Sequence, residues 1–480
     1  MSLTSAMLTA QSSIAARSAE MAIASRNVAN VSNPSYSRLE ANVQSVVSSN
    51  GSVVYVSHAS RMVDQAAFTA TLNSGSMAVA SGSYATMLDQ LNPSGVEPYG
   101  TSTASAIGTL SEVLVAFGND PSNQVLGQSV VNAANGLVGD LKQSSSELIN
   151  ARMEADAAMA RAVDNINVIL SDLEMLNDKI VTGTASGVDV NGLLDERDEM
   201  LKVLSEEIGI DVLHQDNNGI AIYTDSGVTL FEKSAREVTF TSSLSLSSGE
   251  LGNNILVDGI AVAGPDASAP ISGGAIAGYA KMRDETLVTM QTQLDEVAKA
   301  LVDVFQEHEP APGTASADGV FTIVAGAGDL ISRLQVNSAV DPAQGGDVML
   351  LRDGGINGAS FVWNVDGNGG YSGLLNEYVD QLNDVYTFGP GTGLNTSSTL
   401  LEFATNRVSW FSAERTVATE SAMMDATAFQ SNAQMLSNST GVNLDLEMQR
   451  LLTIETSYSA SARLMSTIDN MFKDLLGAVS

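Results

Sequence analysis

Apolar residues recur every seven positions at both ends of this chain. Near the start, one row is Met7, Ile14, Met21 and Val28, and the other is Leu3, Ala10, Ala24 and Val31, with Arg17 as its polar break. Near the end, one row is Leu451, Tyr458, Met465, Phe472 and Val479, and the other is Ile454, Ser461, Ile468 and Leu475. A helix with this repeat buries one apolar stripe against another helix. The two ends are therefore expected to pair with each other or with the ends of other chains.

Composition places the chain among folded, acidic proteins. Its 480 residues allow several domains with cores, and 44% hydrophobic against 16% charged residues argues against wholesale disorder. Lys and Arg total 22 and Asp and Glu total 55, which gives a net charge of -33. A surface of this sign repels nucleic-acid phosphates and anionic lipids, so we predict no nucleic-acid partner and no membrane insertion. Plain solubility is the simpler interpretation of the charge.

The sequence lacks the usual signals for disulfide formation, for a cleaved signal peptide and for a membrane helix. The absence of cysteine excludes disulfides and thiolate chemistry, and it fits export to a place where thiols are a liability. The first residues lack the basic start of a cleavable signal peptide, and no apolar run approaches the ~18 residues of a membrane helix. We therefore expect that any export proceeds without a cleaved signal.

Catalytic and metal-binding patterns are also missing. His58, His214 and His308 lie in unlike segments, and no second histidine follows His308 at the spacing of a helical zinc site. There is no Gly-x-Ser-x-Gly elbow. We predict no catalytic residue, no metal ligand and no cofactor.

Periodicity along the chain alternates between helical and extended. Helical spacing occurs at 1–33, 61–91, 104–117, 124–180, 193–208, 278–308, 374–385, 399–438 and 443–477. Extended patterns occur at 36–60, with a hairpin signal at Asn50-Gly51, and at 210–271, while 310–373 is rich in Gly and Asp and irregular. Proline ends the first helix at Asn33-Pro34, and the segment 92–95 ends the second.

The predicted fold class is mainly α with inserted β. Long terminal helices form a coiled-coil-like core domain, followed by a helical-bundle domain with a small antiparallel β domain inserted into it. The expected division is 1–35 with 441–480 for the core domain, 36–185 with 275–310 and 374–440 for a helical rod-like domain, 186–274 for the β-rich insert, and 311–373 for a variable Gly/Asp-rich insert.

Two acidic features invite other interpretations. Asp195, Glu196, Asp198 and Glu199 surround Arg197, and we expect a solvated helix face in which Arg197 forms local ion pairs. The segments 216–219 and 366–370 resemble oxygen-rich calcium loops, but neither has the downstream Glu of a twelve-residue calcium loop. Turn chemistry explains both segments more simply, which leaves a calcium-binding surface protein as the weaker alternative.

Short motifs at both ends point to one family. The run from Ser25 to Arg38 resembles the N-terminal signature of bacterial flagellar axial proteins, and its Ser-Arg ending resembles the flagellar hook-associated protein 1 family in particular. The runs 440–445 and 458–463 are similar to the family's C-terminal helix, and 193–201 and 278–284 are similar to interior motifs. The motif positions are Asn27, Asn30, Pro34, Tyr36, Arg38, Gly441, Asn443, Asp445 and Arg463.

Two positions depart from the family pattern. Ser35 replaces a glycine, so a turn with positive φ would be strained there. Leu446 stands where the family commonly has Glu, which removes half of a capping box, and we expect the start of the last helix to fray.

The resemblance implies a mechanical subunit with no chemical step. Family members form the junction between hook and filament, self-assemble in a ring or short helical zone, and neighbour the hook protein and the second hook-associated protein. The family also implies type III export to the extracellular flagellum and a cytoplasmic chaperone that binds the C-terminal helix. Another axial protein, such as the hook protein or the second junction protein, is the closest alternative.

We expect the apolar rows to form the polymer interface. Its residues are Leu3, Met7, Ile14, Met21, Val28, Val31, Leu451, Ile454, Tyr458, Met465, Ile468, Phe472 and Leu475. An ordinary helix pair within one chain is the alternative. The polar breaks Arg17 and Ser461 are expected to keep the pair from locking before assembly, so leucine at both positions should tighten it.

Overall fold

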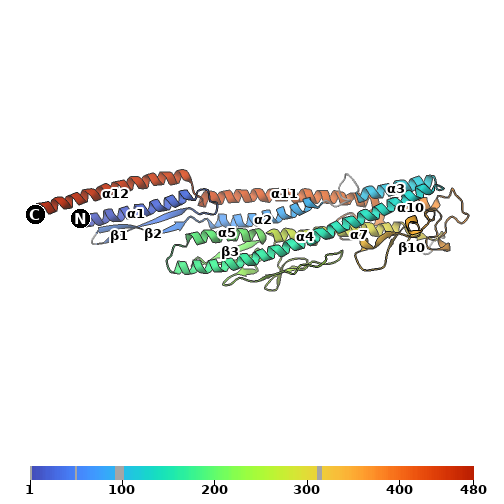
Figure 1. Ribbon diagram of the computed structural model, residues 1–480, viewed down its shortest axis with the longest axis horizontal. Coiled ribbons are helices and arrows are strands. Elements are labelled where there is room, and N and C mark those ends of the chain that lie inside the picture. The colour runs from blue at the N-terminus through green and yellow to red at the C-terminus, as the bar shows by residue number, and fades with distance from the viewer. Residues whose placement is uncertain (1–2, 49–50, 92–101, 311–315, 480) are drawn as a thin grey trace.

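The chain forms a long rod in which both termini lie at the same end (Figure 1). The computed structural model describes residues 3–48, 51–91, 102–310 and 316–479. The predicted turn at Asn50-Gly51 falls partly outside the described residues, and the predicted helix stop at 92–95 falls wholly outside them. No described helix has a stretch long and apolar enough to cross a lipid bilayer.

The end that carries both termini is a thin, three-part assembly. Helix α1 (Leu3–Ala29) and helix α12 (Leu444–Val479) run antiparallel side by side, and the hairpin of β1 (Leu39–Ser48) and β2 (Gly51–Arg61) lies on the other side of α1 (Figure 1). The hairpin is antiparallel, with a bulge between Asn42 and Val43. The expectation that the two ends come together is thus met within one chain.

Long helices build the body of the rod. They are α2 (Gln65–Gln90), α3 (Thr103–Asn119), α4 (Gln124–Ala185), α5 (Asn191–Glu207), α6 (Ala275–Lys281), α7 (Leu287–Val304), α10 (Gly373–Asn383) and α11 (Leu400–Thr440). Their starts follow from local chemistry: Asp64 accepts the Ala67 N–H at 3.0 Å before α2, and Thr399 with Glu402 forms a full capping box at α11. Helix α2 packs along α11.

The inserts consist of short strands and single helical turns. Strands β3 (Ile210–His214), β4 (Ile220–Thr224) and β5 (Thr229–Phe231) form one antiparallel sheet, and β6 (Val238–Thr239), β7 (Ile255–Val257) and β8 (Ile260–Ala263) form a second. Further along lie β9 (Glu307–His308), β10 (Ser316–Ala317), β11 (Phe321–Ile323), α8 (Leu330–Arg333), β12 (Leu334–Val336), α9 (Leu350–Asp353), β13 (Tyr386–Thr387) and β14 (Ser397–Ser398).

Two apolar clusters make up the core, and α4 belongs to both. The N-terminal half of α4, around Leu137 and Leu141, packs with α3, α7, α10 and α11. Its C-terminal half, around Ile166 and Leu173, packs with α5 and the two three-stranded sheets. At 62 residues α4 is about 90 Å long. Between the clusters, Arg283 on the π-helical turn Met282–Thr286 is buried and pairs with Asp156 of α4 at 2.6 Å.

The predicted fold class is confirmed, with several local corrections. The helix predicted at 278–308 starts earlier, contains the π-helical turn, and ends at Val304 because Glu307 and His308 pair as a strand with 316–317. The segment expected to be irregular holds several short elements, stabilised in part by the buried Glu307 carboxylate, which accepts three backbone N–H groups from 355–357. The division into domains stays a prediction, although the hairpin packs mainly on α1 and meets the bundle at its base, where Arg61 pairs with Asp195 of α5.

Candidate assembly interface

Small side chains meet between α1 and α12. The hydroxyls of Ser13 and Ser461 lie 3.1 Å apart, and Ala10, Ala24 and Ile454 are buried nearby. Serine and alanine side chains are small and let the two helix backbones lie close together. The space between the helices at this point is therefore occupied by the side chains of the chain itself.

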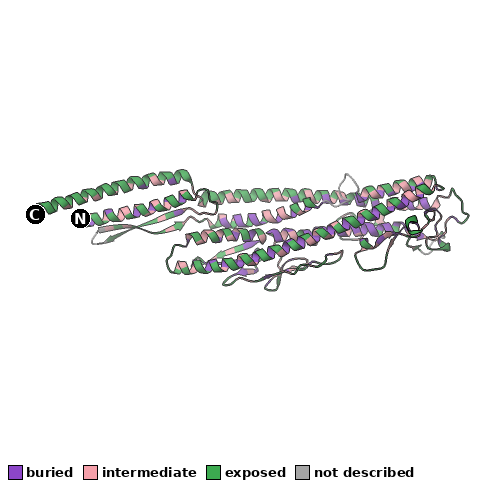
Figure 2. Cartoon of the chain, viewed as in Figure 1, coloured by how far each residue is buried: buried purple, intermediate pink, exposed green. Residues whose placement is uncertain are grey.

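The predicted interface residues lie mostly at the margins of this contact. Only Ile454 among them is buried, and all of them belong to the described part of the chain. Met7, Val31, Tyr458 and Leu475 are exposed, and the half-buried members are Leu3, Ile14, Met21, Val28, Leu451, Met465, Ile468 and Phe472. Figure 2 shows that most of α12 remains exposed. The terminal pair therefore keeps apolar surface open in a single chain.

The two polar breaks in the rows are satisfied within this arrangement. Arg17 pairs with Glu20 at 2.9 Å, and Glu20 is buried. Ser461 lies in contact with Ser13. Leucine at Arg17 would leave the Glu20 carboxylate without its cation, and leucine at Ser461 would have to fit beside Ser13. These contacts argue against the expectation that the two changes tighten the pair, which stays a prediction.

Asn27 holds the hairpin against α1. Its side chain is fully buried; its amide donates to the Leu39 carbonyl at 2.9 Å, and its oxygen accepts the Leu39 N–H at 2.9 Å. The Tyr36 hydroxyl donates to the same oxygen at 2.8 Å. Asn27 thus bonds both backbone groups of Leu39, the first residue of β1, as a neighbouring strand would.

The segment between α1 and β1 is a chain of turns. The Asn30 amide donates to the Arg26 carbonyl at 2.8 Å, and the Ser35 N–H donates to the Asn33 side chain at 3.1 Å beside the exposed Pro34. Among the described residues, positive φ outside glycine occurs at Asn218 and Asp258 only. Ser35 is therefore not strained, and the concern about its replacing glycine does not apply.

Arg38 joins this segment to the elbow between α11 and α12. Its N–H donates to the Thr440 carbonyl at 2.8 Å, and its guanidinium lies 3.6 Å from the buried carboxylate of Glu447. At the elbow, a Cβ on Gly441 would lie 2.4 Å from the Ser437 carbonyl oxygen, so only glycine fits without a shift.

Asn443 caps α12 despite the missing glutamate. Its side-chain oxygen accepts the N–H groups of Asp445 at 3.0 Å and Leu446 at 3.2 Å. The helix is formed from Leu444 onward, so the expected fraying is not seen. The side chains of Asp445 and Arg463 are exposed.

Three of the four acidic residues around Arg197 on α5 bind the terminal region; Asp195 and Asp198 are half-buried, which corrects the expectation of a solvated face for these two, while Glu196 and Glu199 are exposed as expected. Arg61 at the end of β2 pairs with Asp195 at 3.0 Å and with Asp198, and the Ser35 hydroxyl donates to Glu199 at 2.7 Å. Burial raises the pKa of Asp195 and the nearby Arg61 opposes that shift, while the Ser35 hydrogen bond lowers the pKa of Glu199.

Arg197 does not form the local ion pairs expected of it. It is buried and donates to the Asn218 carbonyl in the turn between β3 and β4. Burial lowers the pKa of its guanidinium. Asn218 itself has a φ of 62°, and Asn217 accepts the Gly219 N–H at 3.0 Å, so this segment is a side-chain-stabilised turn.

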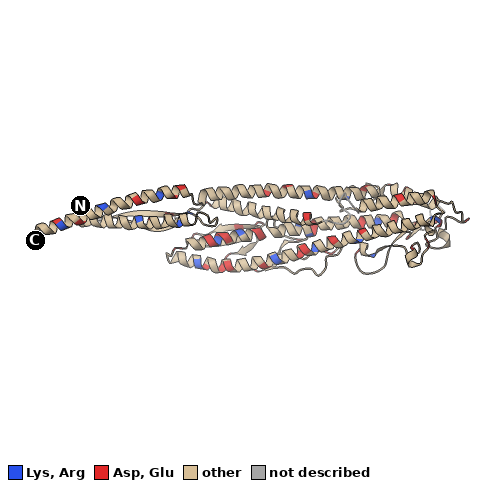
Figure 3. Ribbon diagram, turned by 45° about the horizontal axis from the view of Figure 1, so that its top comes forward, with Lys and Arg blue, Asp and Glu red and all other residues tan. Residues whose placement is uncertain are grey.

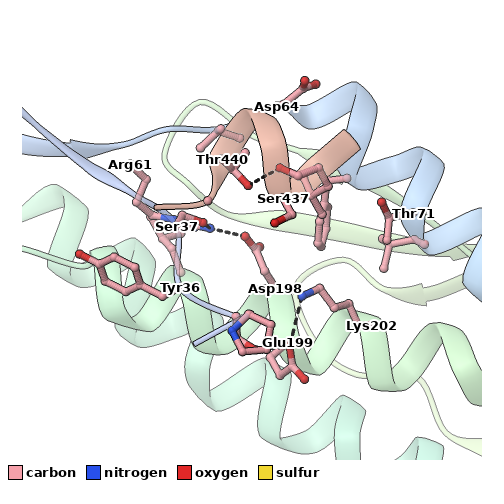
Figure 4. A pocket seen from close by; sticks show the side chains of 18 of the residues that line it. Tyr36, Ser37, Arg61, Asp64, Thr71, Asp198, Glu199, Lys202, Ser437 and Thr440 are labelled. Carbon is pink, nitrogen blue, oxygen red and sulfur yellow. Dashed lines mark hydrogen bonds and ion pairs between the residues drawn. The ribbon is translucent and has the colours of Figure 1, made fainter. Parts of the chain in front are cut away.

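A cavity of about 520 Å³ lies behind these contacts, between the terminal segment, α2, α5 and α11. Figure 4 shows Arg61 and Asp198 pointing toward each other at its edge, with Lys202 beside Glu199 and with Ser437 and Thr440 on the opposite wall. The joint between terminal region and body is thus held by polar contacts around a space, not by a filled apolar core.

Family comparisons cover the interior and the C-terminal helix. A model described as the flagellar hook-associated protein FlgK helical domain matches residues 88–311. A model described as the flagellar basal body rod FlgEFG protein C-terminal region matches residues 437–478. Flagellar hook-associated protein 1 of Escherichia coli is 26% identical over 215 residues, which are 44% of this chain and 38% of that protein. The chain belongs to the FlgK family.

Other FlgK proteins give similar matches. Flagellar hook-associated protein 1 of Salmonella typhimurium is 26% identical over 203 residues, or 41% of this chain and 35% of that protein. The solved flagellar hook junction protein FlgK from Burkholderia pseudomallei has 21% identity and a TM-score of 0.44, covering 54% of this chain and 47% of that one. The matches to the curated FlgK proteins thus cover well under half of their length.

Over the matched residues the chain is therefore similar to flagellar hook-associated proteins. The C-terminal match includes the elbow glycine and the Asn443 cap, which agrees with the motif positions chosen from the sequence. Sequence reasoning missed Arg61 and the role of the α5 carboxylates, because nothing local indicates that residues 61 and 195 meet. The one indication in the sequence was Arg61 itself, an arginine at the end of an extended segment in a chain rich in acidic residues.

Proposed function

We propose that this FlgK-family chain is a structural subunit of the junction between flagellar hook and filament. It assembles with its own copies in a ring or short helical zone, between the hook protein and the second hook-associated protein. The observation that supports this is the half-open terminal pair: small residues at its centre are flanked by apolar side chains such as Met7, Tyr458 and Leu475, which stay 38%, 37% and 54% exposed.

Covering those side chains would favour assembly. Fully burying one Leu or Met side chain contributes about 1.5–3 kcal/mol, so each half-exposed member of the rows adds about 1 kcal/mol when a neighbour covers it. Several such residues on each copy offset the cost of association. The predicted interface residues keep this role as a proposal.

A junction subunit must also pass mechanical load from its assembled end to its body. The pairs of Arg61 with Asp195 and Asp198, and the bond from Arg38 to Thr440, connect these two parts on both sides of the cavity. We infer that this joint sets the angle between the terminal region and the rod.

Electron microscopy of a strain lacking this chain tests the proposal. Hooks present without filaments, with filament subunits released into the medium, would support a junction role. Loss of the hooks themselves would refute it, because a junction subunit acts after hook assembly.

Another axial protein is the second candidate, and the match of residues 437–478 to a rod-protein model favours it. Rod and hook subunits are needed before the hook is complete. The same deletion strain therefore separates the two candidates by whether hooks are present.

We further propose export through the flagellar type III channel to the extracellular flagellum, with a cytoplasmic chaperone that covers the C-terminal helix beforehand. The exposed apolar residues of α12, including Leu452 and Leu464, support this, because they would promote premature association. Deleting 440–480 should abolish chaperone binding in a pull-down, and retained binding would contradict the assignment.

A further inference from the structure

Charge is divided sharply between the two parts of the rod. Residues 1–61 contain four arginines and two acidic residues, and residues 441–480 contain three basic and five acidic residues. The terminal region is thus neutral as a whole, and the entire net charge of -33 belongs to residues 62–440. Figure 3 shows acidic residues crowded on the body around α4 and α5. Bodies of neighbouring copies repel one another, whereas their terminal regions do not.

Charge within the terminal region is balanced inside one copy. The four arginines of residues 1–61 are all ion-paired: Arg17 with Glu20, Arg26 with Asp189, Arg38 with Glu447, and Arg61 with Asp195 and Asp198. The terminal region of one copy therefore does not repel that of a second copy.

Strand β1 presents an unprotected edge. The free edge of β2 is covered by α1, since Thr9 donates to the Ser52 carbonyl at 2.8 Å and the Ser12 hydroxyl accepts the Val54 N–H at 3.1 Å. Among the described residues no further strand pairs with β1. Val46 and Val47 are exposed on opposite faces of β1, Val47 to 83%. Natural edge strands usually carry lysine, proline or inward charges, and β1 has only Glu40.

A matching apolar surface lies on one flank of α12, outside its contact with α1. Leu464, Met471 and Leu475 are spaced to share this flank, and each is more than half exposed. Helix α12 therefore carries apolar side chains on the face that contacts α1 and also on the adjacent flank that α1 does not cover.

We propose that the exposed valine side chains of β1 in one copy pack on this flank of α12 in a second copy, with the backbone groups of the β1 edge left at the solvated margin of the contact. The inference rests on the proposed function, because it assumes that the terminal regions assemble. Since the hairpin and α12 are different surfaces on opposite sides of α1, the contact is heterologous: it repeats from copy to copy and produces a ring or a helical row, not a closed dimer.

Cross-linking tests the contact directly, because the chain has no cysteine of its own. Flagella are isolated from cells whose only copy is the Val47→Cys, Leu464→Cys double variant, treated with a short bis-maleimide, and run on a denaturing gel. A ladder of multimers is expected from the double variant and monomers from each single variant. A matched control pairs Val47→Cys with Leu244→Cys, which is fully exposed on the body and should give no ladder.

The other possible results of this experiment refute either the contact alone or the contact together with the proposed function. Monomers from the double variant, in flagella that contain the chain, refute the β1–α12 contact and leave the junction role intact. Dimers from Val47→Cys alone would show edge-to-edge pairing and also refute it. Absence of the unmodified chain from flagella refutes the proposed function and the contact together. If the double variant does not assemble, Val43→Cys with Met471→Cys provides the same test on the same two surfaces.

Discussion

Replacing Asn27 by alanine should release the hairpin from α1. The substitution removes three hydrogen bonds at a fully buried site, and it leaves the N–H and the carbonyl of buried Leu39 without partners. Tyr36 is only half-buried, so water can replace its lost acceptor. An unsatisfied buried backbone group costs about 1–2 kcal/mol, so the two Leu39 groups predict a loss of about 2–4 kcal/mol in the free energy of opening this unit.

Native-state hydrogen exchange measures this loss where it occurs. Amides of β1 and of the last turns of α1 should exchange about 30- to 1000-fold faster in Asn27→Ala, while amides of α4 should be unchanged. Asn30→Ala is the matched control, because that side chain bonds the Arg26 carbonyl at an exposed position and should cost under about 0.5 kcal/mol. Equal effects of the two substitutions would refute the reasoning.

Four further predictions test the joint and the terminal pair. Arg61→Gln should lower the free energy of unfolding in urea by about 2–3 kcal/mol, because it leaves two largely buried carboxylates without their cation. The control Arg26→Gln breaks only an exposed pair with Asp189 and should lower it by under about 0.5 kcal/mol. Ser461→Leu should separate α1 from α12 at a cost of about 1–3 kcal/mol and Ser459→Leu, which is exposed, should not; equal thermal shifts would contradict this. The pKa of Glu199 is lowered in the folded chain, so this carboxylate contributes stability above pH 4.5, its ordinary pKa, and that contribution is lost as the pH falls. Ser35→Ala removes the hydrogen bond and should raise the pKa of Glu199 in an NMR titration. An unchanged pKa would count against the bond. Limited proteolysis should cut 1–30 and 445–480 faster in free monomer than in polymer, and equal protection would show that assembly adds no order.

The long helices could be predicted because their information is local. Heptad spacing located α1 and α12, and the rows of Ile166, Leu173 and Ile180 located the end of α4. The motifs placed Asn27, Tyr36 and Arg38 near the joint but could not reveal their partners. Those partners lie on segments that meet only in the folded chain, as Arg38 meets Thr440 and Glu447.

The interpretation of Asp195 and Asp198 on α5 failed for the same reason. Charged runs usually face solvent, and the sequence gives no sign that Arg61 returns to Asp195 across 134 positions. Arg197 likewise was expected to pair locally, yet burial against the β3–β4 turn gave it a carbonyl partner instead. Sequence spacing also could not show that the hydroxyls of Ser13 and Ser461 lie in contact, which argues against the predicted effect of filling that position.

Helix α4 runs without interruption through both apolar clusters, and this gives the body the character of a single beam. The two clusters are joined by continuous helix, since the first uses buried α4 residues up to Leu148 and the second uses buried α4 residues from Met159 onward. A twisting load applied at the joint with α5 would accordingly reach the far end of the rod as rotation of the whole body, with little of it absorbed as bending between two separately hinged halves.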